Sequence, residues 1–183
     1  MIRKVFYSFC GSEEINRVRI VTDRLAAQGA QKIAGIISRQ EFERMKKKGG
    51  HAIQNWIKEQ LDGTSVTVVL LGTNTLKNNF VQYQIWESMK RGNAIIGVYI
   101  NRIRDMQTQK TEERGNIHMV VAYYKYGTPV YFDYINDGMY DYITDDGYHN
   151  LNEWIEEAAK KRQGRETNKR WGTTRSTLCH MMG

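Results

Sequence analysis

The spacing of apolar residues changes between strand-like and helix-like along the first half of the chain. Residues 2-IRKVFYSF-9 alternate, carry β-branched and aromatic side chains, and predict the first strand. Two continuous apolar runs, 66-VTVVLLG-72 and 94-AIIGVYI-100, are typical of strands covered on both faces. A shorter run, 33-IAGII-37, predicts one more strand between them and the first.

Helical spacing separates these strands. Apolar residues recur at helical intervals after 11-GSEE-14, whose serine is the expected N-cap, and Gly29 ends this helix. Further amphipathic helices are predicted over 51-HAIQNWIKEQL-61 and 79-NFVQYQIWESMKRG-92. Because strands and helices alternate, the sequence predicts an α/β fold, a central parallel sheet of about five strands with helices on both faces.

The second half of the chain is less regular. Residues 102-RIRDMQTQKTEERGN-116 predict a polar excursion, and 129-PVYFDYI-135 predicts a further strand. Residues 151-LNEWIEEAAKKR-162 predict a final helix, with acids early and bases late, as the helix dipole favours. No periodicity follows, so we expect one domain over residues 1–163 and a basic, flexible C-terminal tail over 164–183.

Length and composition fit a soluble globular domain. The chain has 183 residues, of which 40% are hydrophobic and 26% charged, enough for one domain with a core. No apolar run reaches the roughly 18 residues of a membrane span, and the N-terminus lacks the pattern of a signal peptide. Cys10 and Cys179 lie far apart, which argues against a disulfide framework. We therefore expect no membrane association and a cytoplasmic location.

The formal charge of +7 raises the question of nucleic-acid binding. The tail supplies +3 of it, from four basic residues and one acid, and 44-RMKKKGG-50 is the densest cluster elsewhere. A solvated surface is the favoured interpretation of that cluster, so nucleic acid is not an expected partner. The same charge is compatible with holding an anionic nucleotide.

Candidate chemistry is expected at one edge of the predicted sheet. Ligands of open α/β sheets bind outside the carboxyl ends of the strands, where four segments meet: 7-YSFCGSEE-14, 38-SRQEFERM-45, 72-GTNTLKNN-79 and 101-NRIRD-105. The first offers backbone amides that can hold phosphate, although no dinucleotide fingerprint or P-loop is present.

Other chemistries have weaker support in the sequence. The 4 histidines are scattered, without metal-ligand spacing, so no metal is expected. Cys10 is interpreted as a structural residue rather than a catalytic thiol, because no histidine can be placed beside it. Trp56 and Trp86 are interpreted as core residues rather than stacking platforms.

Two stretches of the chain together resemble a known family. Residues 4-KVFYSF-9 and 55-NWIKEQLDGTSVTVVLLGTNTLKNNFVQYQIWESMKRGNAIIGVYIN-101 are similar to the bacterial TIR-like family of the sensor subunit of Thoeris antiphage defence, ThsB. The resemblance covers roughly the first hundred residues well and the remainder loosely.

The resemblance implies a flavodoxin-like TIR fold that cleaves nicotinamide adenine dinucleotide (NAD). NAD is then a substrate, and no cofactor is expected. Members of the family release nicotinamide and transfer the ADP-ribosyl group to an acceptor, forming a nucleotide signal that activates a separate effector protein. A phage-derived trigger and self-association of the domain are further expectations. By the same resemblance, the substrate-binding candidates are Ser8, Phe9, Cys10, Asn78, Phe80 and Tyr83.

This sequence departs from the family at the catalytic position. The family has Glu in a "YEI" motif, whereas this chain reads 83-YQI-85, which places Gln84 at the catalytic position. An amide keeps the shape of the carboxylate but loses its charge, so binding should survive while turnover should not. Gln84 is interpreted as a deliberate inactivating substitution that traps substrate or a partner, or as the mark of a naturally silent homologue. The first is favoured because the surrounding motif is intact. Relatives often have His or another polar residue at the position of Cys10, which leaves the contribution of that loop open.

Three hypotheses for function follow. The first is an NAD-cleaving signal synthase carrying an inactivating Gln84. The second is a non-catalytic TIR-type module that recognises a phage component or assembles with its own kind. The third, a nucleic-acid-binding domain, rests on charge alone and would show a salt-dependent affinity.

Overall fold

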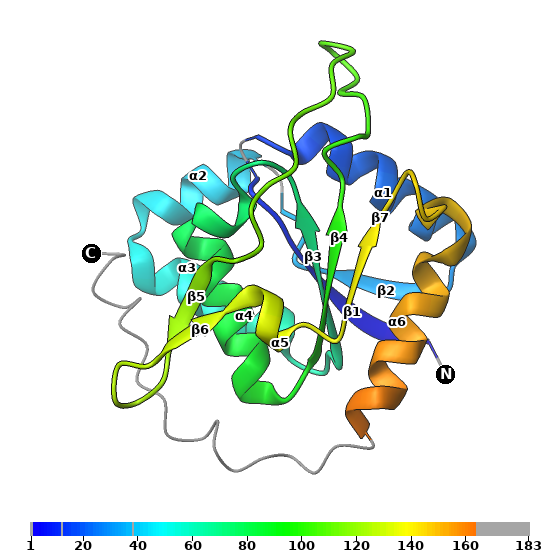
Figure 1. The fold of residues 1–183 in the computed structure, drawn as a ribbon. Coiled ribbons are helices and arrows are strands. Elements are labelled where there is room, and N and C mark those ends of the chain that lie inside the picture. The colour runs from blue at the N-terminus through cyan, green and yellow to red at the C-terminus, as the bar shows by residue number, and fades with distance from the viewer. Residues whose placement is uncertain (1, 12, 38, 164–183) are drawn as a thin grey trace.

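A five-stranded parallel sheet forms the centre of the molecule (Figure 1). The structure is a computed structural model and describes residues 2–11, 13–37 and 39–163. The strand order is β2-β1-β3-β4-β7, the flavodoxin-like arrangement. The strands are β1 Arg3–Ser8, β2 Gln31–Ala34, β3 Val66–Leu71, β4 Ala94–Tyr99 and β7 Gly138–Asp141.

The remaining elements connect and cover these strands. A small antiparallel hairpin forms from β5 Val120–Tyr123 and β6 Pro129–Tyr131, apart from the central sheet. The helices are α1 Ile15–Gln28, α2 Arg39–Lys47, α3 Gly50–Leu61, α4 Asn79–Arg91, α5 Phe132–Ile135 and α6 Gly147–Gln163, and η1 Thr75–Lys77 is a 3₁₀ turn.

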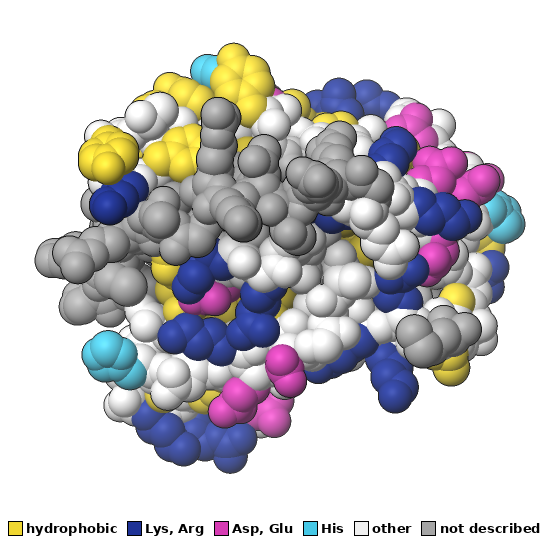
Figure 2. All heavy atoms as spheres, turned by 90° about the horizontal axis from the view of Figure 1, so that it is seen from below, with side chains coloured by type: hydrophobic (Ala, Val, Ile, Leu, Met, Phe, Trp, Pro, Cys, Tyr) yellow, Lys and Arg dark blue, Asp and Glu magenta, His cyan; other side chains and the backbone are white. Residues whose placement is uncertain are grey.

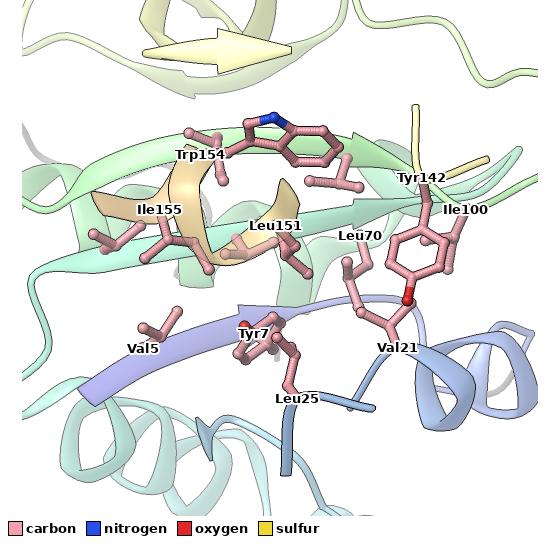
Figure 3. Close-up of a cluster of buried hydrophobic side chains, with 14 of the residues drawn as sticks. Val5, Tyr7, Val21, Leu25, Leu70, Ile100, Tyr142, Leu151, Trp154 and Ile155 are labelled. Atoms are coloured by element: carbon pink, nitrogen blue, oxygen red, sulfur yellow. The ribbon is translucent and has the colours of Figure 1, made fainter. Parts of the chain in front are cut away.

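Helices cover both faces of the sheet, as predicted. Helices α1 and α6 pack on one face, where the apolar core includes Val5, Tyr7 and Leu151 (Figure 3). Helices α3 and α4 and the hairpin pack on the other face, around Phe6 and Ile57. Because side chains alternate along a strand, Val5 and Tyr7 face α1 and α6 while Phe6 and Ser8 face α3 and α4.

The fifth strand is not where the sequence placed it. Residues 129–135 do not form a strand of the central sheet. Pro129–Tyr131 pairs with β5 in the hairpin, and Phe132 begins the short helix α5, fully buried. The fifth strand is Gly138–Asp141, which pairs with β4 in parallel. Its sequence, GMYD, contains a glycine and an acid and carries little strand signal.

Other boundaries also differ from expectation. The structure contains helix α2 over Arg39–Lys47, where the sequence predicted no helix. Helix α1 begins at Ile15 with Glu14 at the N-cap position, and the expected cap, Ser12, lies outside the described residues. Helix α6 begins four residues before the predicted start, at Gly147, so its first turn contains no acid, although Lys160 and Lys161 are in its last turn.

The polar excursion after β4 rises above the carboxyl ends of the strands (Figure 1). It is fixed to α1 by the buried Arg17, whose guanidinium donates to the carbonyl oxygens of Ile103 (2.9 Å) and Lys110 (3.2 Å) and to Glu112 (2.7 Å). Its tip folds around Asp105, whose carboxylate accepts from the amides of Gln107 and Thr108 and from Asn16. These bonds to the charged form, led by the Thr108 amide, lower the pKa of Asp105 to about 2.

Charge is mixed on the amino side of the sheet. Figure 2 views the molecule from below and shows Lys and Arg side chains interleaved with Asp and Glu on this face. None of the described helices is long and apolar enough to span a membrane. The expected C-terminal tail, residues 164–183, lies outside the described residues.

Candidate functional site

A cavity of about 210 Å³ opens beside the carboxyl ends of β1 and β2. Its walls come from the loop after β1, the loop after β2, helices α2 and α3, and the first two turns of α4. A single water needs only about 10–15 Å³ of such space, so the cavity is large enough to admit an organic ring system.

Gln84 contributes to the wall of this cavity from α4. Its side chain is 8% exposed, and its carbonyl oxygen accepts a 2.5 Å hydrogen bond from the hydroxyl of Ser8, the last residue of β1. Ser8 is fully buried and faces α4 because of the alternation along β1. The pair joins the candidate catalytic position to the carboxyl end of the central sheet.

A buried polar network holds the backbone of α4 behind Gln84. The hydroxyl of Ser88 donates to the main-chain oxygen of Gln84 (2.7 Å) and accepts from Thr67 of β3 (2.7 Å). Asn93 donates in turn to the Thr67 hydroxyl (3.2 Å). Position 84 is therefore tied to two neighbouring strands, and small movements of α4 against the sheet are resisted.

The first turn of α4 is capped at the cavity wall. The Asn78 side chain accepts from the amides of Phe80 and Val81, as an N-cap residue does. Its NH₂ group lies 3.4 Å from the sulfur of Cys10. Cys10 is buried, with 4% exposed, and it does not line the cavity itself. The cap thus links the loop after β1 to the helix that carries Gln84.

Aromatic side chains form one side of the cavity. Phe42 of α2 and Phe80 of α4 meet edge to face, with ring centroids 5.3 Å apart, and Trp56 of α3 is half-buried beside them. Phe9 lines the cavity from the loop after β1. Such a group of rings suits a flat, weakly polar ligand group.

Helix α2 contributes charged side chains to the cavity wall. Lys46 and Glu43 are both exposed, and Lys46 lies one helical turn after Phe42, on the same face of the helix. Lys46 is the single cation among the described residues that line this cavity. A ligand with an apolar ring and an anionic group would meet a suitable partner for each.

The backbone approaches closely at Gly35, on the wall formed by the loop after β2. Gly35 has φ of +85°, and a Cβ atom there would overlap the carbonyl oxygen of Tyr7 and the ring of Phe6. Only glycine fits this conformation and this contact. The loop after β2 is consequently pressed against β1, which brings α2 close enough to α4 to close the cavity.

A buried carboxylate lies behind the cavity at the start of α1. Glu14 is 1% exposed; it accepts from the amide of Cys10 (2.8 Å) and from the hydroxyl of Thr75. Burial raises its pKa to about 7, against the opposing effect of these two hydrogen bonds. A Cβ atom at Gly72, directly after β3, would overlap this carboxyl group, so a larger residue there would displace the Glu14 side chain.

The sequence-predicted site residues are only partly brought together. Phe9, Asn78, Phe80 and Gln84 line the cavity. Ser8 and Cys10 lie behind its wall, in contact with Gln84 and Asn78 respectively.

Tyr83 lies apart from the cavity. It is buried on another side of α4, with its ring near Trp86 and its hydroxyl 3.1 Å from Glu87. Tyr83 therefore does not line this cavity, since neighbouring helix positions face different directions, and its assignment to substrate binding stays a prediction.

Several residues of the site were missed in the sequence. Phe42 and Lys46 belong to a helix that was not predicted, and Trp56, interpreted as core, is half-buried at the cavity. The four-residue spacing of Phe42 and Lys46, which places both on one face of a helix, was the signal in the sequence that could have indicated them. Among the described residues, no group of three or more His, Cys, Asp or Glu side chains could hold a metal ion.

Comparison with known proteins agrees with this fold. The family model of the Thoeris protein ThsB, TIR-like domain, matches residues 6–105. The fold is of the TIR type, and the chain belongs to the ThsB TIR-like family. It is 36% identical over 106 residues to the candidate cyclic ADP-D-ribose synthase ThsB1 of Bacillus cereus (strain MSX-D12). That match covers 57% of this chain and 55% of the relative, so it extends over about half the length of each.

Proposed function

We propose that the cavity binds NAD, with Gln84 at the position where an active relative has its catalytic carboxylate. The single observation that carries the proposal is that Gln84 lines a ring-sized cavity at the carboxyl end of β1 in a chain of the ThsB TIR-like family. The name of the similar ThsB1 protein, a candidate cyclic ADP-D-ribose synthase, supports a substrate that contains ADP-ribose.

The walls of the cavity suit the parts of a dinucleotide. A base stacks among Phe42, Phe80 and Trp56, where aromatic contact is available on more than one side. The pyrophosphate lies at the mouth near Lys46. The ribose that carries nicotinamide lies beside Gln84, whose amide can hydrogen-bond to the ribose hydroxyl groups.

Cleavage of NAD requires a negative charge beside the ribose in addition to these binding contacts. Breaking the bond between nicotinamide and ribose builds positive charge on the ribose, as in glycoside hydrolysis. A carboxylate about 4 Å from that charge contributes about 4 kcal/mol at an effective dielectric constant of 20, which is about a thousandfold in rate. Gln84 keeps the hydrogen-bonding geometry of such a group without its charge. The chain as it stands therefore binds substrate and turns it over poorly.

In its biological setting the active form of this site supplies a signal. Nicotinamide leaves, and the ADP-ribosyl group is transferred to an acceptor. The acceptor is another atom of the same molecule, a separate small molecule, or water. The resulting nucleotide activates a separate effector of antiphage defence, in keeping with the Thoeris family to which the chain belongs.

The test is to restore the carboxylate. The Gln84→Glu protein is incubated with NAD, and nicotinamide and nucleotide products are measured by mass spectrometry. We expect release about a thousandfold faster than from the unchanged chain. Robust turnover by the unchanged chain would show that Gln84 does not stand in the place of a required carboxylate.

Glu87 provides a matched control in the same helix. It is 3% exposed and bonded to Tyr83 (3.1 Å) and Lys90 (3.3 Å), outside the cavity wall. Adding Glu87→Gln to the Gln84→Glu protein should change nicotinamide release little. A large loss of release would move the catalytic acid from position 84 to Glu87.

A second function has one observation in its favour, which is Gln84 itself. A TIR-type module that binds without catalysis would need the cavity shape and not the charge. If Gln84→Glu releases no nicotinamide although NAD still binds, a binding or assembly role becomes the better account.

A further inference from the structure

Two loops that build the cavity are joined beneath it by one buried acid, Glu14. The loop after β1 gives the cavity Phe9 and Gly11, on either side of Cys10. The segment between β3 and α4 gives it Asn78. Glu14 accepts from the main chain of the first loop, at Cys10, and from Thr75 in the second segment.

Thr75 transmits the position of this carboxylate to α4. Its hydroxyl also accepts from the amide of Gly72 (2.7 Å), and its carbonyl oxygen accepts from the amide of Asn78 (3.2 Å). Asn78 caps the helix that carries Gln84. A chain of hydrogen bonds thus runs from Glu14 to the first turn of α4.

We propose that Glu14 is a positioning residue for the cavity, whose ionised carboxylate holds the loop after β1 and the start of α4 at the separation that ligand binding requires. This inference rests on the proposed function in naming NAD as the ligand. Glu14 holds these segments in place without touching the ligand.

The hydrogen bonds around Thr75 can take two arrangements. When Glu14 is ionised, Thr75 donates to it, and the carboxylate receives two hydrogen bonds to a charged acceptor. When Glu14 is protonated, its own O–H donates to Thr75, and the Thr75 hydroxyl turns to the carbonyl oxygen of Leu70, 3.4 Å away. Hydrogen bonds to a charged acceptor are the shorter and stronger kind, so the ionised form fixes the separation of the two loops, although burying its charge lowers the stability of the fold.

Ionising Glu14 places a charge in an unfavourable environment. It is almost completely buried, and the acids Glu13 and Glu112 oppose its ionisation, in agreement with a pKa raised to about 7. Other charged or titratable groups on the surrounding elements include Arg17, bound to Glu112 and the 101–116 excursion, Lys77, bound to Asn74, and the Cys10 thiol. A buried acid retained beside a cavity against such a cost is typical of functional sites.

The variant Glu14→Gln tests the proposal because its amide mimics the protonated acid. The Gln oxygen can accept from Cys10 and its NH₂ group can donate to Thr75, which is the neutral arrangement. The matched control is Glu13→Gln. Glu13 lies next to Glu14 in the chain, is exposed, and accepts from Asn74 in the same second segment (3.2 Å).

The measurement is NAD affinity at pH 6 and pH 8. NAD itself has no group that titrates between these values. We expect the unchanged chain and Glu13→Gln to bind about tenfold more tightly at pH 8, the effect of one modest hydrogen bond. Glu14→Gln should bind equally at both pH values, with the weaker affinity that the unchanged chain has at pH 6. Equal pH dependence in all three proteins overturns the proposal.

Hydrogen exchange separates this inference from the proposed function. If the unchanged chain binds no NAD at either pH, the proposed function fails. Amide protection of residues 9–14 and 70–80, corrected for intrinsic rates, then decides the role of Glu14. A difference in the protection of these segments between pH 6 and pH 8, absent only in Glu14→Gln, supports it, and protection independent of pH in every protein overturns it.

Discussion

The hydroxyl of Ser8 at the end of β1 donates to the side-chain oxygen of Gln84 on α4 across 2.5 Å, with both residues buried. A Glu at position 84 would accept the same bond with one oxygen and keep the other for the ribose. We therefore expect Ser8→Ala, introduced into the Gln84→Glu protein, to lower kcat for nicotinamide release by about ten- to a hundredfold, since a hydrogen bond to a charged group contributes about 1.5–3 kcal/mol.

The control for that prediction is Ser88→Ala in the same background. Ser88 is also fully buried, but it donates to the main chain of Gln84 and not to its side chain. Its removal should lower the melting temperature more than it lowers kcat. Equal losses of kcat from the two variants would argue against a specific role of the Ser8 hydroxyl.

NAD should stabilise the unchanged chain without being consumed. A ligand that binds only the folded state at a hundredfold excess over Kd adds about 2.7 kcal/mol to the free energy of unfolding. For a domain of this size that corresponds to a melting temperature higher by about 5 °C or more. Differential scanning fluorimetry with millimolar NAD, followed by a check that the NAD is intact, measures both halves of the prediction. No shift would count against a binding cavity.

Lys46 should govern affinity for the phosphate part of the ligand. We expect Lys46→Ala to weaken ADP-ribose binding about tenfold and to reduce its salt dependence, because it removes the cation from the cavity wall. Adenosine, which has no phosphate, should bind equally to both proteins. Lys47→Ala removes a neighbouring exposed cation outside the cavity wall and should change neither affinity. Calorimetry on the three proteins makes the comparison.

The buried acid behind the cavity should make stability depend on pH. The pKa of Glu14 rises from 4.5 in an unfolded chain to about 7 in the folded one, so the folded state binds more protons between these values. Its contribution to stability is full below about pH 4.5 and is lost as the pH rises through 7. Relative to the unchanged chain, Glu14→Gln should gain about 3 kcal/mol between pH 4.5 and pH 8.

Denaturant unfolding at the two pH values measures this gain, and Glu13→Gln should not show it. A Glu14→Gln protein less stable than the unchanged chain at pH 8 would mean that Glu14 serves folding rather than the cavity.

The first half of the fold was predictable because its signals are local. The continuous apolar runs at 66–72 and 94–100 form β3 and β4, and α4 spans Asn79–Arg91, close to the helix predicted over 79–92. The family resemblance was carried by the same segments. Gln84 could be singled out because its helix and both flanking strands were recognisable.

The rest of the site depends on contacts between distant segments. Helix α2 has a strongly polar sequence, so nothing local indicated that Phe42 meets Phe80 from α4. Glu14 belongs to the predicted helix start 11-GSEE-14, and its bond to Thr75 depends on the pairing of β1 with β3. Strand β7 is placed by its pairing with β4 rather than by its composition. Long-range pairing overrides weak local preference in each case.

The fifth strand and the last helix also affect how the protein is made. Strand β4 gains its second neighbour only when Gly138–Asp141 emerges, and α6 then covers apolar side chains of the face that includes Val5 and Tyr7. At about 5–20 residues per second, several seconds pass on the ribosome between synthesis of β4 and completion of α6. Until Gly138–Asp141 emerges, the nascent chain exposes an unpaired, apolar strand edge, the kind of surface on which chaperones act and through which chains aggregate.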